Sequence, residues 1–212
     1  MNAIDRLLGT AALLRHGARP ALVCGEQTLT YAELAARVGR ASAALRTLGI
    51  EPGDRVLLLA RDTPEYVVAW LGVIHCGAVA IGLNTKLSEE DYRHIRVDSA
   101  ARLAIIEDVF VDARPDLAAE LAREDCLAVA GDRVRPGLRS WRAALAEARA
   151  DAPAFDAPPD HPMVLGSPVH AIRWAPDGSA IYADIVHDGQ SGIYRWRLPR
   201  RGDAKPLPVA TR

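Results

Sequence analysis

The chain has 212 residues, half of them apolar and a quarter charged, which allows one large domain or a medium domain with a small attachment. Its formal net charge of −1 excludes a general electrostatic attraction to nucleic acid or to an anionic membrane. No apolar stretch approaches the length that a membrane-spanning helix needs.

The three cysteines, Cys24, Cys76 and Cys126, stand far apart in apolar surroundings. A disulfide framework or a zinc site needs close pairs such as C-x-x-C, and the sequence has none. We therefore predict three small, buried side chains in a reducing compartment. Residues 1–6 lack the basic start and the long apolar run of a signal peptide, so we expect a soluble, cytoplasmic protein.

The stretch over residues 55–83 organises the sequence. It contains two short apolar runs, at 56–60 and 78–83, of the kind that form strands buried on both faces of a parallel sheet. Between them, Thr63 can cap a helix that begins at the following proline, and Gly77 can end it in a left-handed conformation. This pattern predicts a βαβ unit and an α/β fold with a parallel sheet and flanking helices.

Helix caps and apolar runs alternate on both sides of this unit. Residues 21–30 predict a hairpin with a glycine-containing turn. Thr30 and Glu33 form a capping-box signature, and apolar residues follow at helical spacing until Gly49. Further elements are predicted downstream: a helix capped by Ser88 and Asp91, a strand over 102–106, a helix over 116–123, a strand over 126–129, and a helix capped by Ser140 that carries Trp141 and Leu145.

The pattern changes at residue 151. Residues 151–162 are rich in proline and predict no regular element. Antiparallel strands are predicted after them, over 169–174, 180–186 and 193–198, with turns at 175–178 and 187–192. We therefore divide the chain into four parts: an α/β region over 1–150, a linker over 151–168, a β-meander over 169–198 and a loose tail over 199–212.

The turn after the strand at 56–60 decides whether the βαβ unit binds a dinucleotide. It reads Arg61-Asp62-Thr63-Pro64, with no glycine to let backbone amides approach a pyrophosphate. The G-x-G-x-x-G and Walker patterns are absent from the sequence. The sequence therefore argues against nicotinamide or flavin binding.

Other reactive residue types have structural interpretations. The histidines lack metal-ligand spacing, and the adjacent His75 and Cys76 point in different directions from a helix end. The acidic run over 89–91 matches the ordinary preference for acids in a helix's first turn. Three aromatic residues are interpreted as core rather than as a ligand platform: Tyr66, Trp70 and Tyr92. We assign no catalytic, cofactor-binding or metal-binding residue.

Three motifs occur in a fixed order: LTYAEL at 29–34, GIEPGDRV at 49–56 and WLGVIHCGAVAIGL at 70–83. Together they resemble the N-terminal region of the adenylate-forming enzymes, the AMP-dependent acyl- and aryl-CoA synthetases. Asn84-Thr85 and the DSAAR segment at 98–102 continue the resemblance. It runs from about residue 7 to about residue 164 and is strongest to the benzoate–CoA ligase branch.

This resemblance implies a reaction in which a carboxylate attacks the α-phosphate of ATP and a thiol such as CoA then displaces AMP. The family would use ATP, Mg and CoA, and it holds the phosphates in a Ser/Thr/Gly-rich loop that ends in lysine. That loop should begin just after Val164, yet residues 165–170 read LGSPVH, and the later adenine, acyl-pocket and lysine segments do not follow. We therefore expect an inactive ligase fragment that binds none of these cofactors alone.

The segments IRWAPDGSAIY at 172–182 and GIYRW at 192–196 resemble one β-propeller repeat of the TolB or prolyl-peptidase type. Propellers need several blades, and a lone blade exposes both edges and one apolar face. We expect it to dock only weakly on the α/β region. The alternatives to a ligase fragment are a non-catalytic binding or assembly module that uses this meander and a fused gene product without selected function. Partners would be a complementing synthetase fragment or a second copy joined through exposed β-edges.

Overall fold

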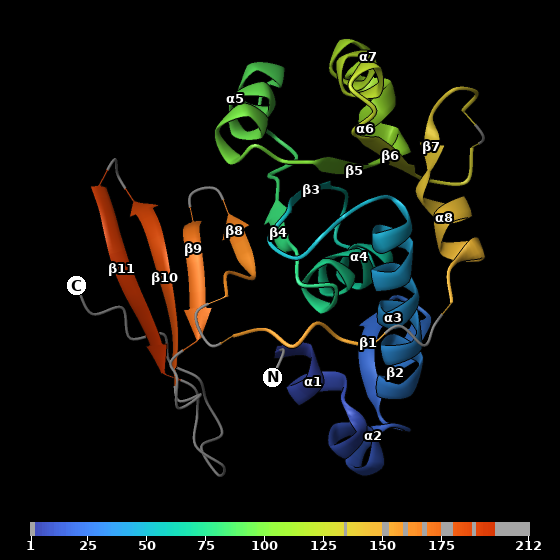
Figure 1. Ribbon diagram of the computed structural model, residues 1–212, viewed down its shortest axis with the longest axis vertical. Coiled ribbons are helices and arrows are strands. Elements are labelled where there is room, and N and C mark those ends of the chain that lie inside the picture. The colour runs from blue at the N-terminus through green and yellow to red at the C-terminus, as the bar shows by residue number, and fades with distance from the viewer. Residues whose placement is uncertain are drawn as a thin grey trace.

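The computed structural model describes residues 3–133, 135–149, 153–158, 161–166, 169–174, 180–187 and 190–197, with side chains as far as residue 163 (Figure 1). The helices are α1 (Ala3–Leu8), α2 (Thr10–His16), α3 (Tyr31–Thr47), α4 (Pro64–His75), α5 (Glu89–Ser99), α6 (Asp108–Ala113), α7 (Pro115–Arg123) and α8 (Trp141–Glu147). The strands are β1 (Pro20–Cys24), β2 (Gln27–Thr30), β3 (Arg55–Leu59), β4 (Val79–Gly82), β5 (Leu103–Glu107), β6 (Leu127–Ala130), β7 (Arg139–Ser140), β8 (Val164–Gly166), β9 (Val169–Trp174), β10 (Ala180–His187) and β11 (Gln190–Arg197).

One nine-stranded sheet has the order β11-β10-β9-β8-β4-β3-β5-β6-β7. The strands from β8 to β7 run parallel to one another, and β9, β10 and β11 form an antiparallel meander. β1 and β2 form a separate antiparallel hairpin, as predicted. The α/β class and the βαβ unit are confirmed, because β3, α4 and β4 follow in sequence and β3 pairs with β4 in parallel.

Both faces of the parallel sheet are covered by helices. Figure 1 shows α5, α6 and α7 on one side of the sheet and α3 and α4 on the other. In β3, Leu58 packs with residues of α1, α3, α4 and α8, whereas Leu57 and Leu59 pack with residues of α5, α6 and α7. Successive side chains of a strand point to opposite faces, so a strand buried on both faces must be apolar throughout.

The predicted helix caps are confirmed. Thr30 and Glu33 exchange hydrogen bonds in a capping box at the start of α3, and Ser88 and Asp91 do the same for α5. Thr63 accepts a hydrogen bond from the backbone N–H two residues inside α4. Each cap satisfies amide groups that the first turn of a helix leaves without partners.

Two helices end in matched Schellman turns. α3 is followed by Gly49 with φ of 84°, and α4 is followed by Gly77 with φ of 90°. The N–H groups of Ile50 and Ala78 close the two turns onto carbonyl groups inside their helices, at 3.0 Å in each case. Glycine is favoured in both turns because a left-handed backbone carries a steric cost for residues with a Cβ atom.

The turn after α5 has the same left-handed geometry without a glycine. Ala100 is exposed and has φ of 48°. Ala100→Gly is expected to raise the free energy of unfolding by about 0.5–1 kcal/mol, because the relief of strain exceeds the added entropy of the unfolded chain. Urea denaturation measures this change, with Ala100→Val, which is expected to be destabilising, as the matched control. A loss of stability in Ala100→Gly would contradict this explanation.

The predicted linker over residues 151–168 is corrected at its C-terminal end. Residues Val164–Gly166 form β8, which pairs in parallel with β4 and, through Val164 and Ile172, in antiparallel with β9. Through β8, the meander continues the sheet of the α/β region. This short strand was not predicted because a proline-rich stretch precedes its few apolar residues. Residues 153–158 contain no helix or strand, as predicted.

Other elements differ from the prediction in detail. The meander itself is confirmed, but β11 begins at residue 190 rather than 193, because its pairing with β10 continues to His187. The predicted turn at 175–178 and the tail over 199–212 lie outside the described residues. α1, α2 and α6 were not predicted, and neither α2 nor α6 has a side-chain hydrogen bond at its N-cap.

The cysteines are buried in two of the three positions. Cys76 and Cys126 lie in the core, where their Sγ–H groups donate to the carbonyl oxygens of Val73 at 3.1 Å and Leu121 at 3.3 Å. Cys24 is exposed, which corrects the prediction, because it ends a strand of the small outer hairpin. In the part of the chain that the structure describes, no helix has the length and apolar character to cross a bilayer.

Candidate functional site

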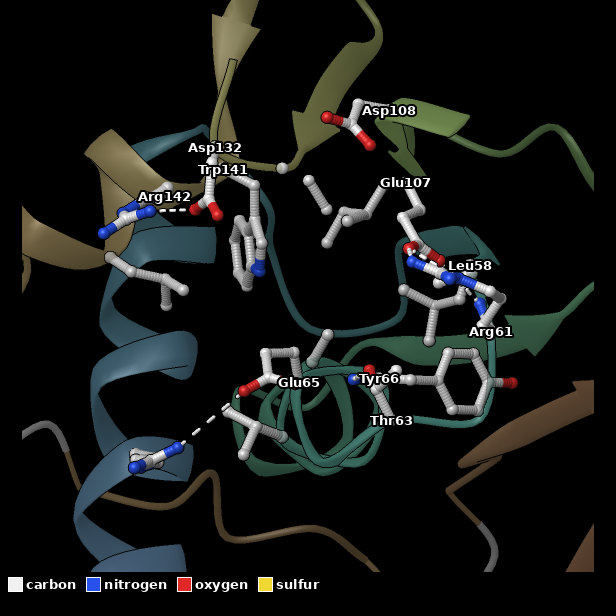
Figure 2. A pocket seen from close by; sticks show the side chains of 18 of the residues that line it. Leu58, Arg61, Thr63, Glu65, Tyr66, Glu107, Asp108, Asp132, Trp141 and Arg142 are labelled. Atoms are coloured by element: carbon white, nitrogen blue, oxygen red, sulfur yellow. Dashed lines mark hydrogen bonds and ion pairs between the residues drawn. The ribbon is translucent and has the colours of Figure 1, made fainter. Parts of the chain in front are cut away.

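A cavity of about 750 Å³ lies at the edge of the sheet where β3, β5 and β6 reach their C-terminal ends. Residues from α3, α4 and α8 complete its walls (Figure 2). Because parallel strands all end at the same edge, the segments that leave neighbouring strands meet there. Open α/β sheets bind ligands at this edge, so we treat the cavity as the candidate site.

The inner wall of the cavity is apolar. Leu58 of β3 and Ile105 of β5 come from the sheet, Val68 comes from α4, and Trp141 and Leu145 come from α8. Trp141 is only 4% exposed. Ser140 caps the start of α8, since its hydroxyl accepts a hydrogen bond from a backbone N–H of the first turn at 3.2 Å.

Arg61 and Glu107 join the ends of two neighbouring strands. The backbone N–H and the Nε of Arg61 donate to the two carboxylate oxygens of Glu107, each at 2.8 Å. Burial raises the pKa of Glu107, but the hydrogen bonds from Arg61 outweigh this effect, and the net pKa is lowered. The same pair raises the pKa of the Arg61 guanidinium. Both groups are therefore ionised at neutral pH, and they fix the loop after β3.

The remaining charges around the cavity are also largely paired. The Arg37 guanidinium lies 4.0 Å from the Glu65 carboxylate, and Arg142 forms an ion pair with Asp132 (Figure 2). Asp108 binds Arg133, which lies outside the lining, at 3.4 Å. Arg40 has no ion pair with any residue that the structure describes. The cavity consequently presents an apolar wall and a rim of mutually neutralised charges.

The polar side chains at the mouth serve structural roles. The Thr63 hydroxyl accepts the Tyr66 N–H at 3.3 Å and so caps α4. Burial, with a smaller contribution from Asp62, raises the pKa of Tyr66, so its phenol is protonated at neutral pH. No group of three or more metal-ligating side chains occurs among the described residues. The cavity can enclose an apolar group with a polar end, but its lining residues do not pair a nucleophile with a general base.

The reactive residue types considered in the sequence lie outside this cavity. His75 and Cys76 end α4, where burial and the nearby Arg46 lower the pKa of His75 and burial raises the pKa of Cys76. Asp91 belongs to the cap of α5, and Glu89 forms an ion pair with Arg93 at 3.1 Å. These contacts support the structural interpretation of both clusters.

The aromatic residues divide between core and cavity. Tyr92 is 2% exposed and donates its hydroxyl to the Asn84 carbonyl at 2.8 Å, as expected for a core residue. Tyr66 and Trp70 are partly buried and pack against the core, and Tyr66 also lines the cavity, which its assignment to the core did not include. Its ring stacks on Trp70, with centroids 6.5 Å apart.

Sequence reasoning missed the two residues that join the strand ends. Arg61 and Glu107 each stand directly after a run of apolar residues, and this position predicts a place at the ligand-binding edge of a parallel sheet. A comparison of the residues that follow each predicted strand would have identified both.

The scaffold described above matches a family model over residues 10–166, which is described as "AMP-binding enzyme". The chain belongs to the AMP-binding enzyme family. The matched range begins at α2 and ends at the last residue of β8, so it contains the whole parallel sheet and excludes the meander. The resemblance to adenylate-forming enzymes is thereby confirmed for the α/β region.

Two relatives in this family come from Thauera aromatica. The chain is 40% identical over 132 residues to a 3-hydroxybenzoate–CoA/4-hydroxybenzoate–CoA ligase, an alignment that covers 62% of this chain and 25% of the relative. It is 34% identical over 191 residues to a benzoate–CoA ligase, which covers 89% of this chain and 36% of the relative. The chain therefore spans about a quarter to a third of the length of these family members.

Solved structures agree with this placement. The benzoate CoA ligase of Burkholderia xenovorans LB400 superposes with a TM-score of 0.67 and 26% identity, over 87% of this chain and 34% of that one. The anthranilate CoA ligase AuaEII, at 22% identity and a TM-score of 0.69, covers 87% of this chain and 35% of that one and shares its fold. The AMP-binding fold over residues 10–166 thus corresponds to the N-terminal region of much longer ligases.

Proposed function

We propose that this chain supplies the N-terminal scaffold of an aryl-CoA ligase and does not form an acyl-adenylate by itself. The observation that carries the proposal is the extent of the family match. It ends at residue 166, the last residue of β8, which pairs with β4 in the parallel sheet. Residues 165–170 then read LGSPVH in place of a phosphate-binding loop. The names of the relatives, hydroxybenzoate– and benzoate–CoA ligases, support an aromatic acid as the substrate of the complete enzyme.

Two arginines that line the cavity are not available to bind the phosphates of the family's ATP or CoA. Arg61 is bound to Glu107 and Arg142 to Asp132, so the charges of these two guanidinium groups are already neutralised. The loop after β3 presents a threonine cap to the start of α4 rather than free backbone amides. We therefore assign no ATP, Mg or CoA contact to these residues.

A chimera tests the proposal. Residues 10–166 would replace the matching segment of the Thauera aromatica benzoate–CoA ligase, and benzoate-dependent pyrophosphate release would be measured. If these residues are a scaffold, the rate should stay within about tenfold of the parent, a barrier change of about 1.4 kcal/mol. The unmodified ligase is the reference. A chimera that melts cooperatively like the parent but releases no pyrophosphate would show that this region is not an interchangeable scaffold.

A second candidate function is an assembly module built on the meander, whose sequence resembles one propeller blade. β11 stands at the end of the sheet, and its outer side has no strand partner among the described residues. Such an edge can add a strand from a second copy or from a complementing fragment. Light scattering after gel filtration should then show a dimer that is lost in Ile193→Pro. A monomer at all concentrations would exclude self-association.

A further inference from the structure

Between α8 and β8 the chain contacts the C-terminal ends of two helices, and we name its residues 153–158 and 161–163 the strap. The strap is held at helix ends. The Arg46 Nη2 near the end of α3 donates to the Pro153 carbonyl at 2.8 Å, and the Phe155 N–H donates to the His75 carbonyl at 2.8 Å. His75 is the last residue of α4, whose final carbonyl groups have no partner within the helix. The strap thus adds a hydrogen-bond partner for the His75 carbonyl to the Schellman turn that ends α4.

The Phe155 ring packs directly on Gly77. A Cβ atom placed on Gly77 would lie 2.6 Å from the Cγ and Cδ1 atoms of Phe155. The matched glycine after α3, Gly49, has nearly the same φ, but a Cβ atom there would have no other atom within 4 Å. Turn geometry therefore explains both glycines, and ring packing is an additional requirement at Gly77 alone.

His161 contacts both Gly77 and Phe155. Its Nε2 atom lies 2.6 Å from the Gly77 carbonyl oxygen, and its ring centroid lies 5.2 Å from that of Phe155. A carbonyl oxygen only accepts hydrogen bonds, so the Nε2 atom carries the proton and donates. The same oxygen accepts a hydrogen bond from the Gly53 N–H at 2.9 Å, which links Gly77 to the turn before β3.

The contact between His161 and Gly77 has the same alignment as the pairing of β8 with β4. Val164 pairs with Ala80, and His161 and Gly77 each stand three residues before these partners. Between them, the Met163 carbonyl accepts the Ala80 N–H at 2.9 Å. A strand of three residues specifies its own register weakly, because few side-chain and backbone contacts distinguish one alignment from the next.

We propose that the strap is a register clamp: Phe155 packs on Gly77, His161 binds its carbonyl oxygen, and these contacts determine which residues of β8 pair with β4. Because β9 pairs with β8, the clamp also determines how the meander joins the sheet. This inference rests on the contacts of the strap and does not depend on the proposed ligase function.

Hydrogen exchange of single amides in β4 tests the clamp. The Ala80 N–H is bound to the strap side, whereas the Val79 N–H is bound to the Asp54 carbonyl on the β3 side at 2.7 Å. Phe155→Ala and His161→Ala are expected to speed exchange at Ala80 by about tenfold or more and to leave Val79 protected. His161→Gln, whose side-chain amide can donate, should restore much of the protection. Unchanged exchange at Ala80 in both alanine variants would overturn the proposal.

A matched pair of glycine variants separates the clamp from turn strain. Asparagine tolerates a left-handed backbone, so Gly49→Asn and Gly77→Asn carry similar strain, but only the second meets the Phe155 ring. Gly77→Asn should therefore expose the Ala80 amide and Gly49→Asn should not. Equal exchange at Ala80 in the two variants would contradict the clamp. If Gly77→Asn also exposes Val79, β4 has separated from β3, and Phe155→Ala then decides the question.

Discussion

Leu58→Ala is expected to lower the free energy of unfolding by about 2–5 kcal/mol, the range for truncating a fully buried leucine. Leu58 is 1% exposed and lies in β3, between β4 and β5 in the parallel sheet. Leu58 belongs to a buried cluster with residues of α1, α3, α4 and α8 and also lines the inner wall of the cavity, so its truncation removes apolar contacts and enlarges a space that is already present. Urea denaturation followed by circular dichroism measures the loss.

The control for this prediction is the same substitution at an exposed position. Leu14 in α2 is 84% exposed, and Leu14→Ala is expected to change the free energy of unfolding by no more than about 0.5 kcal/mol. Similar losses at both positions would mean that the sheet does not form the core described here.

The βαβ unit and its helix caps were predictable because their signals lie within a few adjacent residues. Thr63 precedes a proline and an apolar helix, Gly77 follows it, and both apolar runs beside them become strands. Ser88 and Asp91 likewise stand at the spacing that a capping box requires. Interactions over three or four residues make such signals visible without knowledge of the tertiary structure.

Features that depend on distant residues were not predictable in the same way. β8 is a strand only because β4 offers it a partner, and its three residues carry no periodic pattern of their own. The cavity brings together Arg61, Glu107 and Trp141 from separate segments, and sequence spacing does not show that they meet. For the same reason Tyr66 was assigned to the core, because helical spacing indicates an inward face but not a hollow beside it.

The 212-residue chain is expected to release no pyrophosphate above blank when it is incubated with ATP, magnesium and a panel of aromatic and fatty acids. Adenylation needs donors that stabilise negative charge developing on the phosphates. The sequence LGSPVH at 165–170 is not a Ser/Thr/Gly-rich motif ending in lysine, and the guanidinium groups of Arg61 and Arg142 are bound to carboxylates.

This assay tests most directly whether the chain is a scaffold without the chemistry of its family. The benzoate–CoA ligase of Thauera aromatica, assayed with benzoate under the same conditions, shows that pyrophosphate is detected. The account predicts a rate equal to the blank for every acid, in each gel-filtration fraction that contains the chain. Steady pyrophosphate release that elutes with the chain and depends on one of the acids would contradict it.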